Sequence, residues 1–197
     1  KHYGKNIMIA YGKGSVKKNG IYDDVVNVLN ECGKNIIDFP DIPANPTYEK
    51  VLEGIKLYKE NDVDLIIAVG GGSVVDCCKI ICAGTEVNDD IWELEFEKGI
   101  IPEKMGNFAV ILTLSGAGAE MDSLGAATYE AKHEKKTLVG PYAKFVIEDP
   151  QYIMSVPYKV FMPGVFDSLT HCMETYFGKT FNVSDLMNEG LMKDIIY

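Results

Sequence analysis

Asp64–Lys79 reads DLIIAVGGGSVVDCCK, and the rest of the chain is interpreted from it. An apolar run, Leu65–Val69, stops at three glycines, and a helical pattern opens at Asp76. We therefore predict a buried strand, a tight turn and the start of a helix. Glycines let a backbone approach a ligand because they carry no Cβ, and the N–H groups at a helix N-terminus suit a pyrophosphate. The alternative is a plain strand-to-helix turn with flexible glycines.

The segments on either side repeat this alternation of strand and helix. Strands are predicted at 6–11, 35–39 and 108–112, with 124–129 and 144–147 as a further pair of strands. Helices are predicted at 16–32, 47–61, 76–84 and 89–94. Such alternation indicates βαβ units and a parallel sheet, which binds ligands at the carboxyl ends of its strands. Three glycine-containing turns fall at that edge, at 12–15, 70–73 and 113–118.

The pattern changes after Asp149-Pro150, where only helical stretches remain, at about 158–178 and 183–197. We predict an α/β dinucleotide-binding domain at 1–150 and the start of a helical metal-binding domain at 151–197. The chain lacks an initiator Met and ends within an apolar periodic run. We therefore expect a fragment in which the helical domain is incomplete.

Composition excludes several classes of protein. The formal charge of −10 and the pI of about 4.8 argue against nucleic acids and anionic membrane surfaces as partners. We find no bilayer-spanning apolar run and no signal peptide. The five cysteines indicate reduced thiols in a cytoplasmic protein. Three of them, Cys77, Cys78 and Cys82, crowd one helix, where we favour core packing over metal binding because no histidine is near.

A second group of candidate functional residues lies in the predicted helix around Val165–Phe177. Asp167 and His171 are four residues apart and share one face, from which both can reach a divalent ion. Glu174 stands on the same face, and the other positions are largely apolar. Burying ionisable groups among such neighbours is costly unless they are paired or coordinated. The alternative is a salt-bridge pattern along the helix.

The order of these motifs resembles the iron-containing (group III) alcohol dehydrogenases, in particular the butanol dehydrogenase or aldehyde reductase branch. The motifs that carry the resemblance are YGKGSVKKNG (11–20), PANP (43–46), VGGGSVVDCCK (69–79), TLSGAGAE (113–120) and GVFDSLTHCMETY (164–176). The resemblance spans nearly the whole chain. It implies a Rossmann-like α/β domain followed by an all-helical metal domain, as in dehydroquinate synthase-like proteins.

The resemblance also implies roles for individual residues. Gly71, Gly72 and Ser73 would hold the pyrophosphate, with Asp76 near the nicotinamide. Asn45 and Lys135 would lie near the nicotinamide ribose. The remaining cofactor-binding positions are Gly12, Gly14, Ser15, Thr113, Ser115 and Gly118. Asp167 and His171 would be the first two ligands of Fe²⁺ or Zn²⁺. Glu174 would support these ligands without binding the metal itself.

Three departures from the family pattern stand out. Ala117 and Ala119 replace residues whose hydroxyls could bond the cofactor. The two further metal-ligating histidines of the family would lie past Tyr197. Gly12 stands where NAD-preferring relatives tend to place an acid for the adenosine ribose, so with Ser15 and Lys18 nearby this position favours NADPH over NADH.

The expected function is the interconversion of a primary alcohol and its aldehyde, with a metal polarising the carbonyl and NAD(P)H supplying hydride. A homodimer is expected from the resemblance alone. One alternative is a dehydroquinate synthase-like lyase that uses NAD and zinc. Another is a nucleotide-binding fragment that is catalytically incomplete.

Overall fold

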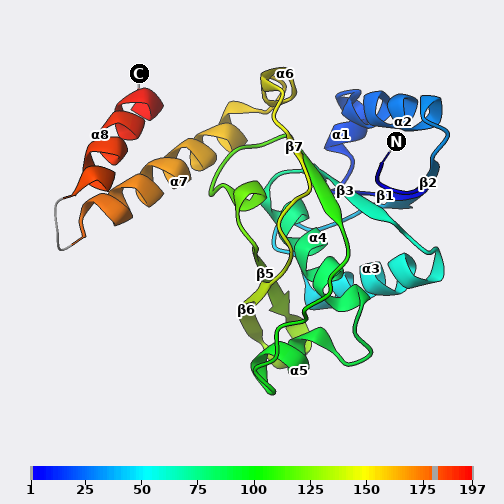
Figure 1. Cartoon of the computed structure of the whole chain (residues 1–197). Helices are drawn as coiled ribbons and strands as arrows, with labels where there is room; N and C mark the ends of the chain where they lie inside the picture. Colours follow the sequence, from blue (N-terminus) through cyan, green and yellow to red (C-terminus); the bar gives the residue numbers. More distant parts are fainter. Residues whose placement is uncertain (1, 179–181, 197) are drawn as a thin grey trace.

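A five-stranded parallel sheet forms the centre of the molecule (Figure 1). The computed structural model describes residues 2–178 and 182–196. The strands run in the order β2-β1-β3-β4-β7, and each pairs in parallel with its neighbours. Their bounds are Asn6–Tyr11 (β1), Asn35–Phe39 (β2), Leu65–Gly70 (β3), Phe108–Leu112 (β4) and Val146–Ile147 (β7). The predicted Rossmann-like fold with a parallel sheet is confirmed.

Two hydrophobic layers cover the sheet because alternate strand residues face opposite sides. Met8 and Ala10 of β1 belong to the core that includes α3 (Tyr48–Glu60) and α4 (Gly72–Thr85), whereas Ile7 and Ile9 belong to the opposite core. That second layer is built on α1 (Ser15–Lys18) and α2 (Ile21–Glu31). Burial on both faces explains why β3 reads as a continuous apolar run.

An antiparallel hairpin lies outside the main sheet and covers α4. Its strands are β5 (Leu124–Tyr129) and β6 (Glu134–Val139). The two further strands predicted at 124–129 and 144–147 are present, the second only as Val146–Ile147. They do not pair with each other: β5 pairs with β6, and Val146–Ile147 joins the edge of the main sheet beside β4. Two short 3₁₀ helices, η1 (Ala119–Met121) and η2 (Glu130–Lys132), lead into β5 and β6.

Two helix boundaries also differ from the prediction. The helix expected at 16–32 is broken near Gly20, whose φ of 79° is left-handed, and so forms α1 and α2. Helix α4 begins at Gly72 rather than at Asp76, one turn earlier, because the glycine turn itself enters the helix. The helix predicted at 47–61 is α3, and Thr47 caps it by accepting a hydrogen bond from the N–H of Lys50 at 3.2 Å.

Only helices follow β7 in the described residues. They are α6 (Pro150–Ile153), α7 (Tyr158–Tyr176) and α8 (Val183–Ile196), and the short α5 (Ile91–Phe96) precedes β4. Tyr197, the last residue of the predicted helical range, lies outside the described residues. Figure 1 shows α7 and α8 extending away from the sheet as a helical pair. The domain boundary near residue 150 stays a prediction. No helix in the described ranges is long and apolar enough to cross a membrane.

Candidate functional site

The strand order creates a crevice between β1 and β3. The chain passes from β1 to β2 on one side and returns to β3 on the other, so these two strands form the switch point at which open α/β sheets bind ligands. A cavity of about 390 Å³ lies at their carboxyl ends. Gly12 and Ser15 line it after β1, Gly71 after β3 and Thr113 after β4. The three turns that the sequence placed at one sheet edge therefore do meet there.

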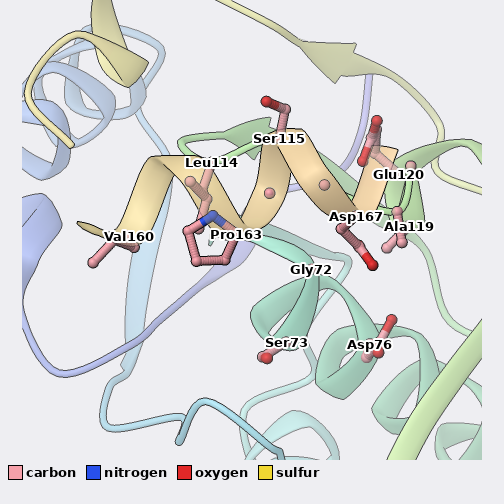
Figure 2. A pocket seen from close by; sticks show the side chains of 14 residues that line it. Gly72, Ser73, Asp76, Leu114, Ser115, Ala119, Glu120, Val160, Pro163 and Asp167 are labelled. Atoms are coloured by element: carbon pink, nitrogen blue, oxygen red, sulfur yellow. The ribbon is translucent and has the colours of Figure 1, made fainter. Parts of the chain in front are cut away.

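A second cavity of about 440 Å³ continues the first, because Leu114 and Val160 line both. Its walls are the N-terminal turns of α4, the 114–120 segment and α7. Figure 2 shows Asp167 reaching from α7 into the space above α4, where Ser73 and Asp76 lie. The two cavities form one groove, which runs from the turn after β1 to the middle of α7.

The start of α4 has the features of a phosphate-binding helix N-terminus. Gly71 occupies the N-cap position, and no side chain caps the first N–H groups of the helix. Gly70 has no room for a side chain, because a Cβ there would lie 2.6 Å from Cγ2 of Val74. The uncapped N–H groups and the positive end of the helix dipole together favour an anionic group in this part of the groove.

Asp76 adds a carboxylate to the wall of the groove, on the second turn of α4. Burial raises the pKa of this carboxyl to about 6, although a hydrogen bond from the backbone of Ala126 and the charges of Lys79 and Lys135 oppose the shift. The group therefore changes charge close to neutral pH.

Three of the predicted cofactor positions do not line the groove. Lys135 Nζ lies 3.4 Å from Oδ1 of Asn45, so the two expected ribose contacts are brought together outside both cavities. Gly14 lies in the turn beside Gly12 with a left-handed φ of 95°. Ser115 and Gly118, in contrast, both line the second cavity.

The two candidate metal ligands lie on one face of α7, as their spacing predicted. Nε2 of His171 is 3.8 Å from Oδ1 of Asp167, and Nδ1 is 3.7 Å from Oε2 of Glu174. The side chains of Asp167 and His171 are 49% and 54% exposed, and α7 has no buried residue, so the cost of burying ionisable groups does not arise among the described residues. No group of three or more potential ligands occurs within 2–178 and 182–196. The pair supplies two donors suited to iron or zinc.

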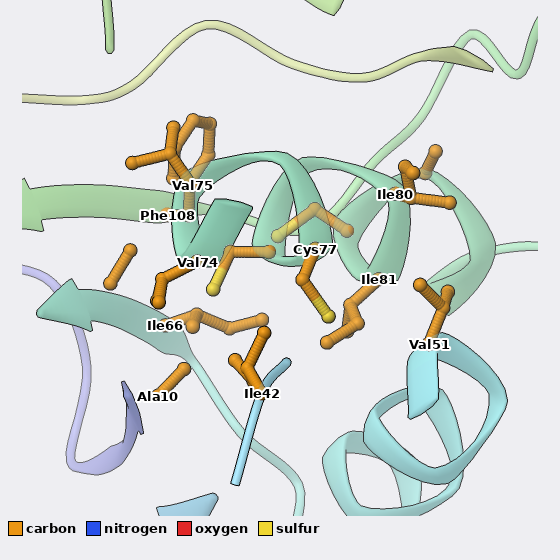
Figure 3. Packing of buried hydrophobic residues seen from close by; sticks show 14 of the residues in the cluster. Ala10, Ile42, Val51, Ile66, Val74, Val75, Cys77, Ile80, Ile81 and Phe108 are labelled. Atoms are coloured by element: carbon orange, nitrogen blue, oxygen red, sulfur yellow. The ribbon is translucent and has the colours of Figure 1, made fainter. Parts of the chain in front are cut away.

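The three cysteines of α4 have a structural role. Cys77, Cys78 and Cys82 are fully buried, and Figure 3 shows Cys77 among apolar side chains of α4, β3 and α3. Burial raises the pKa of the Cys77 thiol to about 12, which leaves it protonated and unreactive at neutral pH. The thiols pack the core, as the sequence indicated.

Sequence reasoning missed the contacts that hold the walls of the groove in place. Ser168 of α7 donates a hydrogen bond to the carbonyl of Gly116 at 2.9 Å. Lys79 of α4 is fully buried and pairs with Asp122, just beyond the 114–120 segment. The sequence did offer one signal for the Lys79 pair, because a lysine stands three residues after Asp76 in an otherwise apolar helix.

The fold and the groove define a Rossmann-like nucleotide-binding class of domain. Residues 1–150 match the model of the family described as iron-containing alcohol dehydrogenase. The chain belongs to this family. The predicted family and the resemblance to its butanol dehydrogenase branch are thereby confirmed.

The relatives show which members of the family the chain is similar to. It is 36% identical to the probable NADH-dependent butanol dehydrogenase 1 of Bacillus subtilis, over all of this chain and 51% of the relative. It is 31% identical to the NADPH-dependent aldehyde reductase YqhD of Escherichia coli, over 96% of this chain and 50% of the relative. The crystal structure of NADH-dependent butanol dehydrogenase A from Thermotoga maritima matches with a TM-score of 0.92 and 34% identity, over 98% of this chain and 49% of that one. The chain thus spans about half the length of the relatives it matches.

Proposed function

We propose that this chain provides the nucleotide-binding part, and two of the metal ligands, of an oxidoreductase that interconverts a primary alcohol and its aldehyde with NADH or NADPH. The observation that carries the proposal is the shared cavity: Asp76 and Asp167 line the same space, beside the uncapped start of α4. A nicotinamide and a metal-held substrate would be adjacent in such a groove. Membership of the family and the dehydrogenase relatives support this proposal.

The chain's residues have separable tasks in this proposal. The N–H groups of Gly72 and Ser73 would bind the pyrophosphate and so fix the direction in which the cofactor lies. Asp167 and His171 would hold Fe²⁺ or Zn²⁺, which when bound supplies Lewis-acid polarisation of the carbonyl. A nicotinamide held beside Asp76 would supply the hydride chemistry of the interconversion. The side chain of Leu114, which lines both cavities, would give the cofactor an apolar contact.

The location and the assembly are also proposals. All five cysteines are free thiols, which supports a reducing, cytoplasmic compartment. Assembly as a homodimer rests on the family resemblance alone, and size-exclusion chromatography with light scattering would test it.

The test is a fluorescence titration of the folded chain with NADH and with NADPH. Saturable binding is expected, because the groove at α4 needs no further segment to hold a pyrophosphate. Gly72→Asp is the variant that tests the pyrophosphate position. Its Cβ would meet only Cβ of Ala119, at 3.7 Å, so the fold accepts it. Its carboxylate would repel the phosphates and weaken binding by at least about tenfold.

Gly190→Asp serves as the control, since it adds the same charge to α8, where nothing lies within 4 Å. It should bind nucleotide like the unmodified chain. A folded chain that binds neither nucleotide, or a Gly72→Asp variant that binds as well as the control, would overturn the proposal for this chain.

A further inference from the structure

The adenosine end of the groove is where NADH and NADPH differ, because only NADPH carries a 2′-phosphate. The inference drawn at this end rests on the proposed nucleotide site. With the pyrophosphate at α4, the part of the groove beside the turn after β1 remains for the adenosine ribose. In dinucleotide-binding folds a carboxylate near the end of a neighbouring strand commonly bonds the ribose 2′-hydroxyl.

Two aspartates flank the end of β2, the strand next to β1. Asp38 is already engaged: the hydroxyl of Tyr22 donates to both of its carboxylate oxygens, at 2.7 and 2.9 Å. Lys17 lies 3.9 Å from the same carboxylate. Asp38 is therefore held in place by Tyr22 and Lys17, whereas Asp41 has no such side-chain partner among the described residues.

Asp41 is the other carboxylate, and it stands directly beside the turn after β1. Its backbone N–H donates to the carbonyl of Gly12 at 3.3 Å, and the next residue, Ile42, bonds Tyr11 at 3.2 Å. Gly12 lines the groove. The side chain of Asp41 is exposed, and it forms no hydrogen bond or ion pair with any described residue. The loop after β2 thus holds the backbone of Asp41 next to Gly12, with an exposed carboxylate that lies outside the lining of both cavities.

The lysines of the β1 turn do not provide a matching phosphate site. Lys17 is committed to Asp38 and lies over the rings of Tyr11 and Tyr22, with Nζ 4.9 and 4.3 Å from their centroids. Lys13 and Lys18 are exposed and, like Asp41, do not line the groove. What holds Asp41 beside Gly12 is the backbone hydrogen bond between the two residues.

We propose that Asp41 is a specificity-determining residue that makes this chain prefer NADH over NADPH. Its carboxylate accepts a hydrogen bond from the adenosine ribose of NADH and repels the 2′-phosphate of NADPH. This reverses the preference expected from Gly12 alone, because the acid absent from the β1 turn is supplied by the loop after β2.

Asp41→Asn tests the proposal with little risk to the fold. Asp41 has a left-handed φ of 64°, and asparagine tolerates that region as well as aspartate does. Asp62→Asn is the matched control: Asp62 is also exposed, with a φ of 45°, but it precedes β3 at the opposite edge of the sheet. Both variants lose one negative charge.

The measurement is the dissociation constant of NADH and of NADPH for the unmodified chain and both variants. We expect the unmodified chain to bind NADH more tightly, and Asp41→Asn to lower the ratio of the NADPH constant to the NADH constant by about tenfold. Asp62→Asn should leave the ratio unchanged. An unchanged ratio in Asp41→Asn, or tighter binding of NADPH by the unmodified chain, would overturn the role of Asp41 while the nucleotide site stands. Absence of binding to either cofactor would overturn both.

Discussion

The ammonium group of Lys79 lies 2.5 Å from Oδ1 of Asp122, with the lysine side chain fully buried and that of the aspartate 48% exposed. Lys79 also donates to the carbonyl of Leu124 at 2.8 Å. The pair therefore fastens the start of the β5–β6 hairpin to α4, the helix whose first turns form the wall of the groove. Its two members differ in their access to water, and this difference predicts unequal effects of removing them.

Removing Asp122 should cost more stability than removing Lys79. Asp122→Ala leaves a buried ammonium with only a carbonyl partner, and we expect the free energy of unfolding to fall by about 3 kcal/mol. Lys79→Met leaves an aspartate that water can reach and fills the same space with an apolar chain, so a loss of about 1 kcal/mol is expected. Urea unfolding of both variants measures the difference. Equal losses would show that the ammonium is not buried as described.

The pH dependence of stability should show the ionisation of Asp76. Because the folded-state pKa of about 6 lies above the ordinary value of 3.8, this group stabilises the fold most below pH 3.8, and the contribution is lost as pH rises through 6. Asp76→Asn cannot ionise. Its gain in stability over the unmodified chain should therefore shrink by about 1 kcal/mol between pH 7.5 and pH 5.5.

Urea unfolding at the two pH values measures this change. Asp62→Asn, at an exposed position, is the control, and its difference from the unmodified chain should be nearly constant. If the Asp76→Asn gain were the same at both pH values, the carboxyl would not be protonated by burial in the folded state.

The central part of the fold was predictable because its signals are local. The apolar run of β3 and the glycines after it determine a strand, a turn and a helix within one short segment. The hairpin was not predictable in this way. Strand β6 begins with the charged residues Glu134, Lys135 and Lys136, and it forms because β5 and α4 are there to pair with it and pack against it. The two-residue strand β7 is likewise defined by its neighbour β4.

The site follows the same division. Residues that adjoin a glycine turn, such as Gly71 and Thr113, reach the groove because parallel strands end at one edge. The separation of Asn45 and Lys135 from the groove depends on where the hairpin lies, which no local pattern specifies. Asp41 has no sequence signal at all, because its relation to Gly12 arises only when the loop after β2 folds back on β1.

Metal binding by this chain should be weak and should depend on Asp167 and His171. Two donors 3.8 Å apart on an exposed helix face bind a divalent ion with little help from burial. We expect calorimetric titration with Zn²⁺ to show saturable binding that is lost in Asp167→Asn and in His171→Ala, with circular dichroism unchanged. Glu174→Gln should retain it.

Other outcomes of the titration would contradict these assignments. Binding that survives in Asp167→Asn would refute the role of that carboxylate as a ligand. Failure of the unmodified chain to bind Zn²⁺ would leave the pair as a salt-bridge pattern along α7.

Gly164 should be the residue that lets α7 rest on the wall of the groove. A Cβ at this position would collide with the carbonyl oxygen of Ser115, a backbone atom that cannot rotate away. Gly164→Ala should therefore displace α7, lower the free energy of unfolding by about 2 kcal/mol and weaken nucleotide binding.

Gly190→Ala is the matched control, because it lies within α8 with nothing inside 4 Å. There the same change only improves helix propensity and should stabilise the chain by about 1 kcal/mol. Thermal unfolding measures the change in Tm of each variant. A lower Tm for Gly164→Ala and a higher Tm for Gly190→Ala would show that α7 packs on the 115–116 turn through Gly164. Equal gains in Tm would mean that the helix does not depend on this contact.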